Sequence, residues 1–161
     1  MKPLLVILMG SQADRKQADA VAEAARPMGM DVKMHIGSAH KTATHVLNLL
    51  KMYESDPRPK VYVTIAGRSN ALSGFTDGAV ISPVIACPPI PEKFGGADIF
   101  SSLSMPSGIA PAVVLDPANA ALLAAKIFAL SDPDIREAVK EFQDSARQKI
   151  LDDDTALNVE G

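Results

Sequence analysis

The apolar run LLVILM at residues 4–9 decides the fold, because every position in it is hydrophobic and its length is that of a β-strand. A strand without polar positions is buried on both faces, which is typical of a parallel sheet covered by helices on both sides. The run ends at Gly10-Ser11, and we expect a helix to follow from about Ala13 to Met28. The start of the chain therefore predicts a central strand and its crossover helix.

The same alternation of strand and helix continues along the whole chain. Further strands are expected at 31–36, 61–66, 83–86 and 112–115. Further helices are expected at 42–54, 71–79, 97–103, 118–130 and 134–151, and the acidic tail from Asp152 is expected to fray. Alternating elements with short links predict one parallel sheet with right-handed crossovers and helices on both faces.

Length and composition narrow the class of protein. The 161 residues predict a single domain, residues 1–161, in which 132–161 form a C-terminal helix and tail. The single Cys87 excludes an internal disulfide, fits a reducing compartment and is expected to be a small buried hydrophobe. A net charge of −3 gives no basic footprint for nucleic acid. No signal peptide or membrane-spanning segment is apparent, which predicts a cytoplasmic protein.

Small and polar residues follow three of the expected strands. They are Gly10-Ser11 with Asp14, the stretch 38–42, and the stretch 67–70. If the first three strands are neighbours, these loops converge at the carboxyl edge of the sheet, where open α/β proteins bind ligands. Glycine and serine let backbone N–H groups approach an anion closely, so the sequence predicts an anion-binding site there.

The stretch SAHKT at residues 38–42 carries the most chemistry. Helix amides at this point favour an anion, His40 can move a proton near neutral pH, and Lys41 suits a phosphate. The alternative is a Ser or Thr helix cap with incidental neighbours, and Asp14 could likewise cap the first helix instead of accepting ribose hydroxyls. His35 and His45 fit packing or surface roles better, and no residues have metal-ligand spacing.

Four motifs then resemble the PurE family of purine biosynthesis. The stretch MGSQAD at 9–14 resembles the family's Gly-Ser-x-Ser-Asp, and SAHKT resembles its Ser-Ala-His-Arg-Thr. The stretches MPSGI at 105–109 and NAALLAA at 119–125 match two later signatures. The resemblance covers nearly the whole chain, in order and with close spacing.

The family has two types, and the departures favour one of them. The mutase type has a loop of small residues that ends in a second histidine, whereas the stretch AGRSNALSG at 66–74 has none. Lys41 replaces the mutase arginine, and Ala13 replaces a serine that would donate to phosphate. Arg68 either supplies a compensating charge or faces away into a salt bridge. The chain therefore resembles the type that carboxylates aminoimidazole ribonucleotide directly with carbon dioxide, and the mutase is the second candidate.

The resemblance implies a flavodoxin-like three-layer α/β/α sandwich with an extra C-terminal helix, and a homo-oligomer, commonly an octamer. It implies that His40 is the general acid and base and that no metal, ATP or other cofactor is needed. The residues expected to bind the substrate are Gly10, Ser11, Asp14, Ser38, Lys41, Gly67, Ser69 and Asn70. Ser69 and Asn70 are expected to donate to the new carboxylate, although Ser69 could instead cap the following helix. The loop 88–96, with Glu92 and Lys93, is expected to close over the site.

The competing class is a flavodoxin-like domain without catalytic activity. A receiver domain needs acidic residues clustered at the end of the first strand, where this chain has Gly10-Ser11. A flavin-binding protein usually stacks aromatic side chains on the ring, and aromatic residues make up only 4% of this chain. Neither alternative fits as well as an enzyme.

Overall fold

One parallel sheet of five strands forms the centre of the molecule in the computed structural model, which describes residues 1–90 and 93–159. The strand order is β2-β1-β3-β4-β5, the flavodoxin-like order, so the first three strands are neighbours as the site prediction requires. The strands are β1 (Leu4–Met9), β2 (Asp31–Ile36), β3 (Lys60–Ile65), β4 (Val84–Ala86) and β5 (Ala112–Val113).

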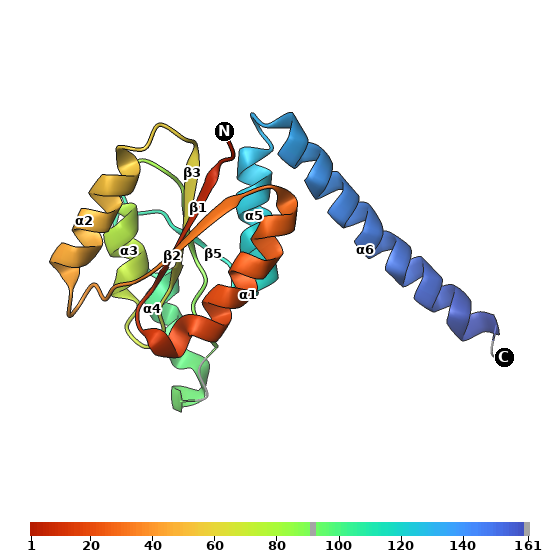
Figure 1. Cartoon of the computed structure of the whole chain (residues 1–161). Coiled ribbons are helices and arrows are strands. Elements are labelled where there is room, and N and C mark those ends of the chain that lie inside the picture. Colours follow the sequence, from red (N-terminus) through yellow and green to blue (C-terminus); the bar gives the residue numbers. More distant parts are fainter. Residues whose placement is uncertain (91–92, 160–161) are drawn as a thin grey trace.

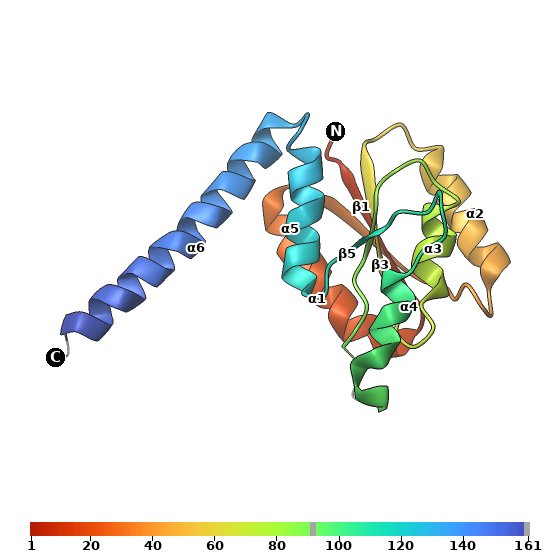
Figure 2. The same ribbon diagram turned by 180° about the vertical axis from the view of Figure 1, so that it is seen from behind.

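Helices cover both faces of the sheet, which confirms the predicted three-layer sandwich. Figures 1 and 2 show α2 and α3 on one face and α1 and α5 on the other. The helices are α1 (Arg15–Ala25), α2 (Ala43–Glu54), α3 (Ala71–Asp77), α4 (Phe100–Leu103), α5 (Pro117–Phe128) and α6 (Pro133–Val159), with short 3-10 turns η1 (Gln12–Asp14), η2 (Arg26–Met28) and η3 (Lys93–Ile99). Within the described residues, none of these helices has the length and apolar character needed to cross a membrane.

All six residues of β1 are buried, as its uninterrupted apolar run predicts. Alternate side chains of a strand point to opposite faces of the sheet. Leu5, Ile7 and Met9 therefore join the core beneath α1 and α5, and the other three residues of the strand join the core beneath α2 and α3. Burial of each face removes apolar surface from water, which stabilises the fold by roughly 25 cal/mol for each Å² buried.

Strand β5 is shorter than the predicted 112–115. Its partner β4 has three residues, and the pairing is limited to Ile85 with Ala112 and Ala86 with Val113. One further backbone hydrogen bond joins the Val114 amide to the Ala86 carbonyl at 2.9 Å. An edge strand extends only as far as its neighbour offers backbone partners, so the length of β4 sets the length of β5.

The prediction that the tail frays from Asp152 is wrong, because α6 continues to Val159. Polar side chains in this region bond to positions one turn away instead of competing with the helix. Gln148 Nε2 donates to Asp152 Oδ1 at 2.8 Å, and Thr155 Oγ1 donates to the Leu151 carbonyl at 2.8 Å. The Gln148–Asp152 side-chain pair is an i, i+4 contact of the kind that stabilises a helix surface. The helix leaves the body of the molecule after its first turns, as both ribbon views show (Figures 1 and 2).

Candidate functional site

The loops that follow β1, β2 and β3 leave from the same edge of the sheet. Met9 pairs with Ile36 on one side and with Ile65 on the other, so the three strands end level with one another. The loops enclose a cleft of about 870 Å³. Its lining residues are Gly10, Ser11, Ala13, Asp14, Ser38, Ala39, His40, Lys41, Ala66, Gly67, Arg68, Ser69, Leu72, Pro89 and Asp98. Every predicted site residue except Asn70 is in this set.

The first wall of the cleft is the turn after β1. The Asp14 carboxylate accepts hydrogen bonds from the Ser11 amide at 3.0 Å and from the Ser11 hydroxyl at 3.1 Å. Asp14 therefore takes part in the cap of η1, as the third residue of a capping box whose N-cap is Ser11, but it makes no side-chain cap bond to α1, the helix that it was considered to cap. A carboxylate has about four acceptor positions, so this cap leaves room for a ligand hydroxyl.

The second wall is the turn between β2 and α2, which is closed by hydrogen bonds between Ser38 and Thr42. The Ser38 amide donates to Thr42 Oγ1 at 2.9 Å, and the Lys41 amide donates to Ser38 Oγ at 3.2 Å. A Cβ on Gly37 would lie 2.6 Å from a methyl of Val46, so only glycine allows this turn to lie so close to α2. The two hydroxyls thus shape the turn, and the side chains of His40 and Lys41 are exposed on the cleft.

The third wall is the loop after β3, where Asn70 does not reach the cleft. Asn70 is buried, its Oδ1 accepts from the Ser73 amide at 3.2 Å, and its Nδ2 donates to Ser102 Oγ at 2.9 Å. Asn70 is therefore the N-cap of α3, and the structure does not place its side chain where a ligand could accept from it. Ser69 does not cap this helix, because Asn70 does, and Ser69 remains exposed in the cleft lining.

Arg68, the neighbour of these residues, has a left-handed backbone with φ of 58°. Its amide donates to Asp98 Oδ2 at 2.8 Å, and its carbonyl accepts from Ser101 Oγ at 2.8 Å. The Arg68 side chain is exposed at the cleft, and among the described residues it forms no ion pair. The alternative that Arg68 turns away into a salt bridge therefore has no support in the described part of the chain.

Two further lining residues come from later segments: Pro89 from the loop 88–96, which is expected to close over the site, and Asp98 from η3, which the sequence did not connect with it. Pro89 lies against Gly67, where an added Cβ would approach its ring at 3.2 Å. Asp98 lies within η3, near its end, and its carboxylate bonds to the loop after β3. Nothing in the local sequence indicates either contact, since both depend on chain segments that lie far apart along the sequence. Of the predicted lid, Glu92 lies outside the described residues, and closure of the loop 88–96 stays a prediction.

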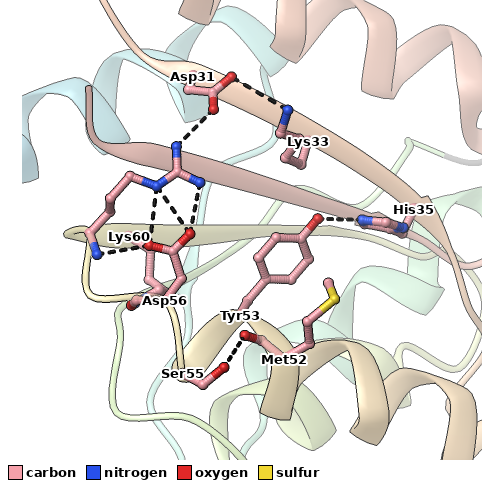
Figure 3. Close-up of polar contacts among 9 residues, drawn as sticks. Asp31, Lys33, His35, Met52, Tyr53, Ser55, Asp56 and Lys60 are labelled. Atoms are coloured by element: carbon pink, nitrogen blue, oxygen red, sulfur yellow. Dashed lines mark hydrogen bonds and ion pairs between the residues drawn. The ribbon is translucent and has the colours of Figure 1, made fainter. Parts of the chain in front are cut away.

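A second polar cluster lies at the amino ends of β2 and β3, away from the cleft (Figure 3). Arg58 contacts Asp31 Oδ2 at 2.8 Å and Asp56 Oδ2 at 2.8 Å, and Lys60 Nζ donates to the Asp56 carbonyl at 2.8 Å. Hydrogen bonds from Arg58 lower the pKa of Asp56 to about 2. The charged groups of this cluster pair mostly with one another, as in an ion-pair network that supports the structure.

The remaining histidines are outside the cleft lining, as predicted. His35 lies 2.5 Å from the Tyr53 hydroxyl, and burial lowers the pKa of its imidazole, helped by His45 nearby (Figure 3). His45 is exposed on α2. Cys87 is fully buried, and burial raises the pKa of its thiol. Within the described residues, no three His, Cys, Asp or Glu side chains gather closely enough to hold a metal ion.

The fold and the cleft define a flavodoxin-like α/β protein with a ligand-binding cleft at the carboxyl edge of its sheet, lined by an imidazole and two cationic side chains. The family model described as AIR carboxylase matches residues 4–149, and the chain belongs to this family.

Three relatives support this membership at high similarity. The chain is 57% identical over 157 residues to the phosphoribosylaminoimidazole carboxylase of Treponema denticola, covering 98% of this chain and 99% of the relative. It is 52% identical to the protein of the same name from Archaeoglobus fulgidus, covering 94% and 83%. The crystal structure of Treponema denticola PurE matches with a TM-score of 0.95 and 56% identity, over 97% of this chain and 99% of that one.

Proposed function

We propose that this chain catalyses the direct, reversible carboxylation of 5-aminoimidazole ribonucleotide with carbon dioxide in purine biosynthesis, without ATP or another cofactor. The observation that carries the proposal is the placement of His40, exposed in a cleft between loops rich in small and hydroxyl side chains, with Lys41 beside it. The names of the two similar curated relatives agree with it. The substrate class follows from the family, and the roles below follow from the cleft.

The ribose phosphate is assigned to the walls formed by the first two loops. Lys41 supplies a positive charge, and the Ser38 hydroxyl supplies a donor, because its oxygen accepts the Lys41 amide and its proton remains free. The Ser11 hydroxyl can donate to the phosphate by exchanging its bond to Asp14. Gly10 presents bare backbone to the cleft, and a Cβ there would make ordinary contacts with Asp14 and Ala66 at 3.5 and 3.6 Å. The acceptor positions of Asp14 that its cap leaves open suit a ribose hydroxyl.

His40 carries the proton transfer in the proposed reaction. The electron-rich ring carbon C4 attacks carbon dioxide, and a C–C bond forms while one C–O π bond becomes a carboxylate. C4 then bears both a hydrogen and the carboxylate, and His40 removes that proton so that the ring regains aromaticity. In the reverse direction protonated His40 returns the proton to C4 and carbon dioxide leaves. Acid–base help of this kind is worth roughly 10²–10⁴-fold in rate.

The loop Gly67–Ser69 is assigned to the carboxylate that develops at C4. Arg68 and Ser69 are both exposed in the cleft lining and provide a charge and a hydroxyl donor. Stabilising charge where it forms is usually the largest catalytic contribution. The absence of a histidine in the stretch 66–74 favours direct carboxylation over the mutase reaction, in which a carboxylate must move from a nitrogen of the substrate to C4.

An ultraviolet assay with separate carbon sources tests this proposal. The carboxylase should consume aminoimidazole ribonucleotide with freshly dissolved carbon dioxide, without ATP, and added carbonic anhydrase should slow this reaction as it converts carbon dioxide to bicarbonate. The N-carboxylated nucleotide should be a poor substrate. Efficient conversion of that nucleotide in buffer stripped of carbon dioxide would show that the chain is a mutase.

We also propose that the protein is a homo-oligomer, an octamer being the expected form, in which α6 packs on a neighbouring subunit. Only the first turns of α6 reach the core, through Ile135 and Val139. The rest extends from the body and exposes apolar side chains, namely Phe142, Ile150, Leu151 and Leu157. An unpartnered helix with large exposed apolar side chains is typical of an interaction surface.

The assembly proposal can be tested by truncation and light scattering. Deleting residues 132–161 should lower the measured mass, but it also removes Ile135 and Val139 from the core. Deleting only 142–161 keeps both core residues and is therefore the sharper variant. An intact oligomer after the shorter deletion would place the end of α6 outside the interface.

A further inference from the structure

Arg68 is the one non-glycine residue with a positive φ in the described part of the chain, and it lies in the wall of the cleft. At φ of 58° the Cβ of an L-residue crowds the following carbonyl oxygen, so this conformation is unfavourable for arginine and easy for glycine. Such strain persists only where the surrounding structure imposes it, and it is found mostly at functional sites.

The segment that holds Arg68 in this conformation is residues 98–101, about one α/β unit further along the chain. Asp98 Oδ2 accepts the Arg68 amide at 2.8 Å, Ser101 Oγ lies 2.8 Å from the Arg68 carbonyl oxygen, and the same hydroxyl accepts the Asn70 amide at 3.0 Å. The Arg68 amide is thus held by Asp98, and the Arg68 carbonyl shares the single proton of the Ser101 hydroxyl with the Asp98 carbonyl, which also lies at 2.8 Å. Asp98 uses one carboxylate oxygen, Oδ2, for the Arg68 amide, and its Oδ1 is buried without a hydrogen-bond partner among the described residues. The Arg68 guanidinium has no ion-pair partner among the described residues.

We propose that Asp98 and Ser101 are positioning residues: by holding Arg68 in the left-handed conformation, they direct its guanidinium to the carboxyl group at C4. The guanidinium then recognises the carboxylated nucleotide and not the uncarboxylated one. This inference rests on the proposed function. It adds that the segment 98–101 sets the preference for the carboxylated nucleotide without touching the nucleotide itself. A planar guanidinium that meets a carboxylate with two hydrogen bonds is a strong and directional contact.

The test compares the affinity of each variant for the two nucleotides, 4-carboxy-5-aminoimidazole ribonucleotide and 5-aminoimidazole ribonucleotide, by calorimetric titration. Asp98→Ala should bind the carboxylated nucleotide about tenfold more weakly and the other less than about twofold more weakly. Asp98→Asn keeps a side-chain oxygen for the Arg68 amide and should remain close to the wild type. Ser101→Ala should shift the preference in the same direction as Asp98→Ala, and it serves if that variant does not fold.

Asp77 offers a matched control. Its carboxylate also accepts a single backbone amide, from Ala110 at 2.8 Å, but Asp77 is outside the lining of the cleft. Asp77→Ala should leave the ratio of the two affinities unchanged. If it lowers that ratio as much as Asp98→Ala does, a general loss of stability explains both effects and the positioning role is wrong.

A double-variant comparison separates positioning from direct contact. Glycine adopts φ of 58° without strain, so Arg68→Gly should lose the preference for the carboxylated nucleotide, and adding Asp98→Ala to it should change that preference no further. A further loss in the double variant, or equal damage from Asp98→Asn and Asp98→Ala, would show that Asp98 acts on the ligand itself. A wild-type protein that binds neither nucleotide overturns the proposed function, whereas a normal wild type with an unchanged Asp98→Ala overturns this inference alone.

Discussion

The two ends of the sheet carry polar clusters that differ in how their charges are balanced. At the amino ends of β2 and β3, Arg58 is shared by Asp31 and Asp56, and the pKa values of both carboxyl groups are lowered. At the carboxyl ends, Lys41 and Arg68 line a cleft and form no ion pair within residues 1–90 and 93–159. The charges of the first cluster are paired within the protein, whereas the Lys41 and Arg68 side chains are unpaired among the described residues and can meet an anionic ligand, although Asp14 and Asp98 line the same cleft. The predictions below test this contrast from its largest consequence to its smallest.

Replacing His40 should have the largest effect. His40→Asn should reduce turnover by more than about 100-fold while the fold and much of the ligand affinity remain, because the imidazole is exposed and makes proton transfer possible without supporting the core. Steady-state kinetics with circular dichroism measures both. His45→Asn, a change at an exposed histidine outside the cleft lining, is the control and should keep normal turnover. A His40→Asn protein with more than about a hundredth of the wild-type rate would contradict acid–base catalysis by this residue.

Replacing Lys41 should mainly affect binding. Lys41→Ala should raise KM about tenfold and change kcat less, because its charge meets a phosphate remote from C4. Lys51→Ala removes a similarly exposed lysine further along α2, outside the cleft lining, and should leave both constants unchanged. An unchanged KM with a collapsed kcat would place Lys41 in the chemistry instead.

Replacing Arg58 should reverse this pattern, with loss of stability and retention of activity. Arg58→Ala leaves Asp31 and Asp56 facing each other without their shared cation, so the melting temperature should fall by several degrees at neutral pH while kcat/KM stays normal. Because the folded-state pKa values of both carboxyl groups are lowered, their contribution is present above about pH 4 and is lost as the pH falls toward 2. The stability of the variant should therefore depend less on pH in that range. Equal acid sensitivity in both proteins would contradict the network.

His35 should produce the smallest effect, seen only in the pH dependence of stability. Burial lowers the pKa of its imidazole below the ordinary 6.5, so the folded state favours the neutral form. The unfolded chain takes up the proton first, and the contribution of His35 is therefore complete above pH 6.5 and declines as the pH falls below it. Between about pH 7.5 and pH 5 the melting temperature of the wild type should fall more than that of His35→Gln. Parallel curves for the two proteins would show that His35 does not titrate differently on folding.

The stretches next to the strands were the most predictable part of this molecule. The run at 4–9 could only be a buried strand, and the glycine, serine and histidine residues that follow the first three strands could be assigned to one edge once parallel order was assumed. Both conclusions depend on local pattern, with a period of two for strands and a fixed direction for parallel pairs. The predicted site residues on these loops, Asn70 excepted, therefore line one cleft, and their roles in binding and catalysis stay predictions.

Asn70 and α6 show where local pattern was insufficient. Asn70 follows β3 as its neighbours do, yet it is the N-cap of α3 and is held by Ser102, a partner 32 residues further along the chain. The end of α6 has the acidic, polar composition of a fraying tail, yet hydrogen bonds between positions one turn apart accompany a helix to Val159. The Asn70–Ser102 contact joins two specific side chains, and the contacts along α6 join specific positions one turn apart; composition reveals neither.

The sequence by itself determined the layers of the fold, the edge at which the cleft lies and the exposed His40 and Lys41, because each of these follows from the pattern of neighbouring residues. Only the tertiary structure decided that Asp98 completes the cleft, that Pro89 of the loop 88–96 lies against Gly67, and that Arg68 has a left-handed backbone. The physical reason is that these features arise from contacts between segments far apart in the chain, such as the Arg68 amide and the Asp98 carboxylate. Such contacts exist only after the sheet has brought those segments together.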